Sequence, residues 1–252
     1  MSEKTLFLAW QDTISQDPLP SRAWFPVAQL DADVDRHFYR FRYINGAKRA
    51  EQAAGFTPLT EFPDFDRDYQ SKELFPLFQN RIMNRTRPDF GDYLHSLDLH
   101  DEADPIEILS RSGGQRITDT YEVFPKIEKG ADGSFTCRFF LHGWRHINQE
   151  ALQRLDNLKT GEELYVTLEL TNPATRVAVQ IQTVDYHMIG WAPRYLVDDL
   201  VEAMAEVPSY EAKVVQVNPL PVPSKQRVLV EMRGRWIEHS PMSGDDFKPL
   251  VF

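Results

Sequence analysis

The sequence predicts an α+β protein of two domains, in which β-strands and short helices alternate. Apolar residues alternate with Tyr165, Thr167 and Glu169 over Leu164–Leu170, and Val177, Val179 and Ile181 share one face of the following segment, which is the period of half-buried strands. Proline and aspartate recur at predicted helix starts in the first half of the chain, where they favour the first turn. A length of 252 residues suffices for one large domain or two of ordinary size.

The N-terminal domain is expected over residues 1–125 as a mixed sheet with short helices. Apolar and aromatic runs predict its strands, at residues 6–10, 24–30, 38–44 and 123–125. Asn45-Gly46 has the composition of a tight turn. Arg40 and Arg42 share one face of the third strand, which is typical of a solvated pair at a sheet edge.

Short helices are expected within the second half of this domain, at residues 74–83, 88–94 and 104–109. In the last one Asp104 is the predicted N-cap and Pro105 takes the first helical position. Gly113-Gly114 then ends the helix. A phosphate-binding loop is the weaker interpretation, because no Lys-Ser/Thr pair follows and a helix precedes the glycines.

A polar segment with two glycines, residues 126–134, is interpreted as a hairpin loop or an interdomain linker. The second domain is expected over residues 135–240, with residues 241–252 as a C-terminal tail. Its predicted elements are strands at 135–142, 164–170 and 177–184 and helices at 148–158 and 196–204.

Composition excludes several classes of protein. The formal charge of -10 argues against wholesale coating of nucleic acid, although a local basic surface stays compatible with it. The lone Cys137 has no disulfide partner, and we expect a reducing, cytoplasmic environment. Neither a signal peptide nor an apolar run long enough to cross a membrane is found, so no membrane partner is expected. His142 and His146 lack a third ligand nearby, which disfavours a metal site.

Four blocks in the second domain follow one another in a recognisable order. They are Gly143-Trp144-Arg145-His146, Leu170-Thr171-Asn172-Pro173, Arg176 to Ile181, and Ile189-Gly190-Trp191-Ala192-Pro193-Arg194. In this order they resemble the HIRAN domain, over about residues 135–236. The resemblance implies a small β-barrel of SH3 or OB character with one or two helices. It also implies recognition of DNA, in particular single strands and free 3′ ends.

The resemblance places a nucleic-acid site on these blocks. Its expected residues are Trp144, Arg145, His146, Asn172, Arg176, Trp191 and Arg194. Arg145 and His146 take the positions at which the family contacts the nucleotide. Cations that hold phosphates and flat rings that stack on bases are the two components that single-strand binding needs.

Purely structural interpretations of the same residues stay open. Trp191 is as compatible with a core position as with a stacking surface, and Asn172-Pro173 can serve only to make the turn. Basic residues near the C-terminus extend the predicted surface, at Lys225, Arg227, Arg233 and Arg235.

The Asn-Pro loop departs from the family pattern at two positions. Ala174 stands where members that bind DNA ends have an aromatic residue, and Thr175 replaces the usual aspartate. In the family, both positions belong to the part of the pocket that binds a terminal nucleotide. General nucleic-acid binding is therefore better supported than recognition of ends.

The N-terminal domain resembles the N-terminal part of HipA-type kinases over about residues 5–125. The resemblance rests on Phe78-Gln79-Asn80, on the Asp104-Pro105 helix and on the strand that contains Val123. The kinase body and its catalytic motifs are missing from the chain, and no nucleophile and base occur at a recognisable spacing. We therefore expect no enzymatic activity and no cofactor.

Two functions of different kinds follow. The first is a nucleic-acid-binding accessory protein that recognises single-stranded DNA or DNA ends through the HIRAN-like domain. The alternative is a protein-interaction module that partners a HipA-like kinase, or another defence or repair protein, through the N-terminal domain.

Overall fold

The computed structural model describes residues 3–13, 23–203, 210–223 and 225–251. The chain divides into two units. Unit 1 comprises Met1–His95, Leu99–Lys126 and Met242–Phe252, and unit 2 comprises Ser96–Asp98 and Ile127–Pro241. The change of unit at Lys126 lies at the start of the segment predicted as a loop or linker. Of the tail expected over residues 241–252, residues 242–252 belong to unit 1.

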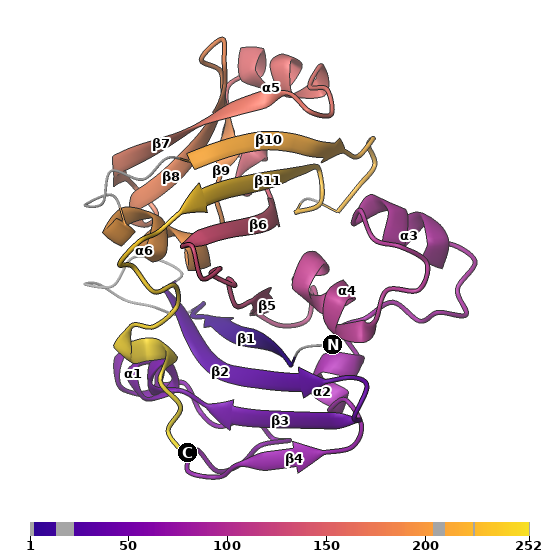
Figure 1. Ribbon diagram of the computed structural model, residues 1–252, viewed down its shortest axis with the longest axis vertical. Coiled ribbons are helices and arrows are strands. Elements are labelled where there is room, and N and C mark those ends of the chain that lie inside the picture. Colours follow the sequence, from indigo (N-terminus) through magenta and orange to yellow (C-terminus); the bar gives the residue numbers. More distant parts are fainter. Residues whose placement is uncertain (1–2, 14–22, 204–209, 224, 252) are drawn as a thin grey trace. The chain divides into compact units, whose positions relative to one another are not determined.

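Unit 1 is organised around a five-stranded sheet in the order β4-β3-β2-β1-β5 (Figure 1). The strands are β1 Lys4–Gln11, β2 Trp24–Asp33, β3 Phe38–Tyr43, β4 Tyr69–Ser71 and β5 Tyr121–Pro125. Every pairing in this sheet is antiparallel, which corrects the mixed sheet expected from sequence. Strands β2 and β3 are joined by a connection too short for the crossover that a parallel pair needs.

The predicted turn at Asn45-Gly46 is wrong, because both residues begin helix α1, Asn45–Ala54. Gly46 is needed there for a close approach to β2. A Cβ atom at this position would lie 1.9 Å from the carbonyl oxygen of Pro26. The glycine therefore serves helix–sheet packing, and the sequence pattern for a hairpin turn misled the prediction.

The remaining helices of unit 1 are short: α2 Pro76–Gln79, α3 Phe90–Ser96 and α4 Pro105–Ser112. The predicted cap of α4 is confirmed. The Asp104 carboxylate accepts hydrogen bonds from the backbone N–H groups of Ile106 and Glu107, and the Glu107 side chain accepts one from the Asp104 N–H. Gly113 ends the helix in the left-handed region, at a φ of 73°, as expected for a C-terminal stop.

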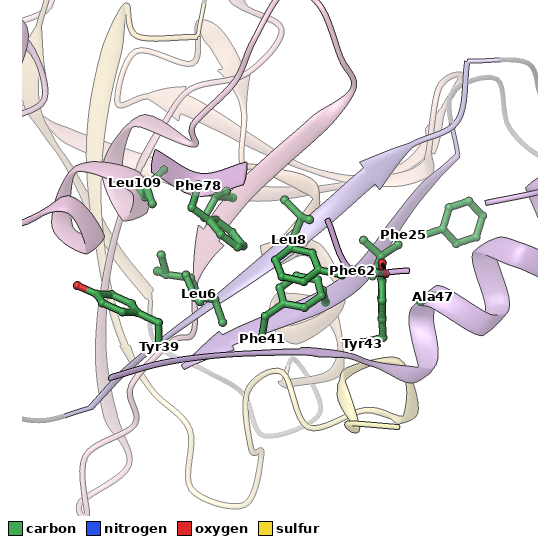
Figure 2. Packing of buried hydrophobic residues seen from close by; sticks show 14 of the residues in the cluster. Leu6, Leu8, Phe25, Tyr39, Phe41, Tyr43, Ala47, Phe62, Phe78 and Leu109 are labelled. Carbon is green, nitrogen blue, oxygen red and sulfur yellow. Dashed lines mark hydrogen bonds between the residues drawn. The ribbon is translucent and has the colours of Figure 1, made fainter. Parts of the chain in front are cut away.

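The core of unit 1 is rich in aromatic side chains. Phe41 and Phe62 stack with ring centroids 3.7 Å apart, and Figure 2 shows this pair beside Tyr43. The buried Tyr43 hydroxyl donates to the carbonyl of Phe62 at 2.8 Å and accepts from the N–H of Leu59 at 2.7 Å. This hydroxyl therefore attaches the irregular segment after α1 to the sheet.

The C-terminal segment completes this unit. Short helix η3, Asp245–Phe247, places Phe247 edge-on against Phe7 with centroids 4.9 Å apart. The N–H of Leu250 donates to the carbonyl of Tyr43, the last residue of β3, at 3.0 Å. The last residues are therefore part of the fold of unit 1.

The arginine pair of β3 does not lie at a sheet edge, because β4 pairs with that strand. Arg42 is buried and forms an ion pair with Asp31 at 2.8 Å. Arg40 pairs with Asp68 at 2.8 Å. The expectation of two solvated arginines is therefore wrong for Arg42, whose carboxylate partner lies on the neighbouring strand.

Unit 2 contains a six-stranded antiparallel sheet in the order β6-β11-β10-β7-β8-β9. The strands are β6 Ser134–Phe140, β7 Glu163–Asn172, β8 Arg176–Thr183, β9 Met188–Trp191, β10 Tyr210–Val217 and β11 Val228–Arg235. In the described part of this unit the sheet is accompanied by the helical segments η1 Trp144–His146, α5 Gln149–Asp156 and α6 Arg194–Glu202. Met204, predicted at the end of the last helix, lies outside the described residues.

The predicted small barrel is not established by this strand order. The last strand, β9, meets the chain just after β6 through an isolated bridge between His142 and Trp191. Among the described residues no longer ladder joins the two ends of the sheet. No helix in the described part of the chain is long and apolar enough to cross a membrane.

Candidate nucleic-acid interface

The Asn-Pro loop is a tight hairpin between β7 and β8. Asn172 pairs with Arg176 across it. The Asn172 side-chain oxygen accepts hydrogen bonds from the N–H groups of Ala174 and Thr175, at 3.0 and 3.1 Å, and from the Thr175 hydroxyl at 3.1 Å. Asn172 therefore makes the turn, as one of the two interpretations of this residue expected.

Arg176 closes this hairpin in an unfavourable backbone conformation. Its φ is 66°, in the left-handed region that favours glycine, asparagine or aspartate. Its side chain is exposed. The hairpin thus carries a cation at the position where a loop of this kind usually has glycine.

The Glu169 carboxylate connects this hairpin to β9. One of its oxygens, Oε2, accepts from Trp191 Nε1 at 2.7 Å and from Asn172 Nδ2 at 2.9 Å. Burial raises the pKa of Glu169, but hydrogen bonds from Asn172, Trp191 and Gln180 outweigh it, so that the pKa lies below its usual value. Glu169 is therefore ionised at neutral pH, and it holds two of the predicted site residues together.

Trp191 is half-buried, and its ring lies against Gly143. A Cβ atom at Gly143 would lie 2.5 Å from a ring carbon of Trp191, and the φ of Gly143 is 67°. Two backbone hydrogen bonds join the strands here: His142 N–H to Trp191 O at 2.9 Å, and Trp191 N–H to His142 O at 3.0 Å. These contacts bring η1 to β9, since η1 begins directly after Gly143.

The three residues of η1 differ in exposure. Trp144 is 9% exposed and packs in the core, so its ring faces are not offered to a ligand. Arg145 and His146 are both exposed. Residues 143–146, the Asn-Pro hairpin and Trp191 are therefore brought together, with Arg145, His146 and Arg176 as their exposed polar members.

Arg194 is the first residue of α6 and is half-buried. The helix begins there as expected, after Ala192 and Pro193, which follow Trp191, the last residue of β9.

Most of the basic residues near the C-terminus that were predicted to extend the surface make contacts within unit 2. Arg227 is buried, where it pairs with Asp156 at 2.6 Å and donates to the carbonyl of Asn218. Arg233 pairs with the buried Glu231 at 2.8 Å. Arg235 donates to the carbonyl of Asp132 at 2.6 Å. Lys225 is exposed, but Arg227 is excluded from the predicted surface by its burial.

Sequence reasoning missed Glu169 as a site residue. The alternation of apolar and polar residues along β7 places Glu169 on the polar face of the strand, and this is the signal in the sequence that could have identified it. Its partner Trp191 is far along the chain, and the pairing of β8 with both β7 and β9 is what brings the two together.

Comparison with known proteins assigns this stretch of unit 2. The family model of the HIRAN domain matches residues 134–233. The crystal structure of a protein from Lactobacillus plantarum is similar at 15% identity and a TM-score of 0.34, over 40% of this chain and 97% of that one. The crystal structure of the HIRAN domain of human HLTF is similar at 15% identity and a TM-score of 0.29, over 42% of this chain and 79% of that one.

No curated protein matches the chain. The resemblance of residues 5–125 to the HipA N-terminal part has no counterpart in these matches and stays a prediction. The family match coincides with the sequence blocks that meet around Trp191, and residues 134–233 therefore form a HIRAN domain.

Proposed function

We propose that the chain binds nucleic acid through unit 2, with single-stranded DNA as its ligand. The observation that supports this most is the assembly around Trp191 within the HIRAN domain, where Glu169 and Gly143 hold the indole between segments that carry the exposed Arg145 and Arg176. In this proposal binding involves no chemical step and no cofactor. Unit 1 has no assigned ligand.

The exposed basic residues lie on two separate segments that meet around Trp191. Arg145 and His146 lie on η1, and Arg176 lies at the end of the Asn-Pro hairpin. Arginine guanidinium groups suit phosphate oxygens because they present several N–H donors in a plane. The indole N–H is already donated to Glu169, so Trp191 offers its ring rather than its donor. Stacking on a ring is tolerant of base sequence.

Glu169 limits where phosphates can lie. It is ionised at neutral pH, and a phosphate beside it would be repelled. The phosphates are therefore assigned to Arg145 and Arg176, on the segments that meet around Trp191. A hydroxyl or base amino group, which donates hydrogen bonds, suits the position next to the carboxylate.

The Asn-Pro hairpin does not supply a partner for a terminal nucleotide. The Thr175 hydroxyl donates to Asn172 within the turn, and Ala174 offers only a methyl group. Binding to an internal stretch of single strand is accordingly the preferred mode, with a free end as the competing one.

The test is fluorescence anisotropy with labelled single-stranded, blunt duplex and 3′-overhang DNA over a range of salt concentrations. We expect the single strand to bind tightest, with an affinity that falls as salt rises. Combining Arg145→Ala with Arg176→Asn should weaken binding and lower the salt slope by about 0.7 for each lost phosphate contact. Asparagine is chosen because it accepts the left-handed backbone of Arg176.

Arg36→Ala in unit 1 is the matched control, since this arginine is 84% exposed and lies outside the HIRAN domain. It should leave the affinity unchanged. Binding to a covalently closed single-stranded circle distinguishes internal binding from binding at a free end. Equal affinity for the circle and the linear strand supports internal binding, and loss of binding to the circle assigns the site to ends. Absence of salt-dependent binding to any of these DNAs contradicts the proposed function.

A further inference from the structure

One face of β7, β8 and β9 continues past Trp191 as a row of uncharged polar side chains. Thr167 pairs with Gln180, which pairs in turn with Trp191, so that these three side chains share a face. Two residues along, Tyr165 pairs with Gln182 on the same face. Gln182 Nε2 donates to the Thr167 hydroxyl at 3.1 Å and to Gln180 Oε1 at 3.2 Å.

This row ends at two exposed tyrosines. Tyr165 is 44% exposed and Tyr186 is 77% exposed. Their ring centroids lie 5.8 Å apart, with an angle of 37° between the ring planes. Two large rings that contact each other and stay exposed are unusual on a surface with no binding partner, because covering their apolar faces would be favourable.

The backbone that presents Tyr186 is strained. Its φ is 68°, in the region that favours glycine or asparagine and that a bulky residue rarely occupies. The turn is nevertheless held: Tyr186 N–H donates to the carbonyl of Thr183 at 2.9 Å, and Arg154 pairs with Asp185 at 3.0 Å. An aromatic residue thus stands where asparagine would be more favourable for the backbone.

The spacing of this face suits an extended nucleic-acid strand. Trp191 on β9 and Tyr165 on β7 lie two strands apart, about 10 Å across the sheet, and two residues, about 7 Å, apart along it. The resulting separation of roughly 12 Å corresponds to about two nucleotide steps of an extended single strand. The nearest acid on the turn between β8 and β9, Asp185, is paired with Arg154, which also pairs with Glu162.

We propose that Tyr165 and Tyr186 form a second stacking site, onto which an unpaired nucleic-acid strand extends from Trp191. This inference rests on the proposed function and adds to it the course of the strand and a dependence on its length. The two glutamines and Thr167 offer hydrogen bonds to base edges along the way. Because every base has a flat face, the second site adds affinity without sequence preference.

The test combines two substitutions that remove the rings and spare the fold. Tyr165→Thr introduces a β-branched residue that favours the strand, and Tyr186→Asn accepts the left-handed backbone. The variant that carries Tyr165→Phe and Tyr186→Phe is the matched control, since it keeps both rings. Thermal unfolding is measured for all proteins, and the ring-deleted variant should unfold no more than a few degrees below the wild type.

Binding is then measured with labelled oligothymidylates, from a dinucleotide to a hexanucleotide. The dinucleotide should bind the wild type and the ring-deleted variant equally, because it does not reach the tyrosines. The hexanucleotide should bind the ring-deleted variant roughly 5- to 150-fold more weakly than the wild type, which is the loss of one stacked base. The phenylalanine control should bind as the wild type does.

Three results overturn the inference. Unchanged hexanucleotide binding in the ring-deleted variant, while Arg145→Ala weakens binding, refutes the second site and leaves the proposed function intact. Failure of the wild type to bind any oligonucleotide refutes both. Self-association of the wild type in sedimentation, lost in the ring-deleted variant whose DNA affinity is unchanged, assigns the tyrosines to a contact between copies of the chain.

Discussion

Replacing Glu169 by glutamine removes one charge from the centre of the interface and keeps nearly the same shape. The carboxylate accepts from Trp191 at 2.7 Å and from Asn172 at 2.9 Å. A hydrogen bond to a charged group contributes roughly 1 kcal/mol more than one between neutral groups. Two such bonds, in a half-buried setting that water reaches, give an expected loss in unfolding free energy of about 1–2 kcal/mol for Glu169→Gln.

The effect on stability has a predictable pH dependence. The pKa of Glu169 in the folded protein lies below the value of 4.5 that it has without the fold. The stabilisation is therefore fully present above about pH 5 and is lost as pH falls through the folded-state pKa. The stability difference between wild type and Glu169→Gln should shrink in step, because protonated Glu169 and glutamine are both uncharged.

The assay is urea unfolding followed by circular dichroism at several pH values, with Glu163→Gln as control. Glu163 is exposed on the same strand, and its substitution should change the unfolding free energy by less than about 0.5 kcal/mol. The indole N–H resonance of Trp191 reports the same bond directly and should move in Glu169→Gln. A wild-type stability for Glu169→Gln, together with an unmoved indole resonance, would refute the assignment of Glu169 as the connecting group.

Three further predictions concern packing and reactivity. Gly143→Ala should destabilise unit 2 by at least about 2 kcal/mol more than Gly161→Ala in thermal unfolding. Both glycines have positive φ, but only at Gly143 would a Cβ atom run into the ring of Trp191. Equal losses of stability in the two variants would contradict this contact. Phe247→Ala should destabilise unit 1 by about 2 kcal/mol and leave DNA binding unchanged; wild-type stability in urea unfolding would show that the C-terminal segment does not complete that unit. Burial and the nearby Glu231 charge raise the pKa of Cys137 to about 12, so the thiol should react with iodoacetamide at pH 7 far more slowly than free cysteine; rapid modification of the folded protein would contradict the raised pKa of this half-buried thiol.

Sequence patterns predicted the features of the fold that depend on near neighbours. The alternation along residues 164–170 gave β7, and the Asp104-Pro105 pair gave a capped helix, because period and capping are local properties. The turn predicted at Asn45-Gly46 was wrong because the conformation there depends on a residue distant in sequence. The dipeptide is compatible with a hairpin turn and with a helix start, and the proximity of Pro26 decides between them.

The candidate site was predictable in its position and less so in the role of each residue. Arg145, His146 and Arg176 are exposed, as a binding role requires, whereas the burial of Trp144 was not apparent from its neighbours. The linking role of Glu169 depends on strand register, which no short motif encodes. The C-terminal segment joins unit 1 through contacts with residues more than 200 positions earlier, and composition alone gave no sign of them.

The most direct test of the proposed interface is a titration of isotope-labelled protein with single-stranded DNA, followed by nuclear magnetic resonance. The proposal predicts that resonances of residues 143–146 and 172–176 and the indole N–H of Trp191 shift together and saturate with one affinity. Shifts confined to unit 1, or spectra that stay unchanged at saturating DNA, would contradict it.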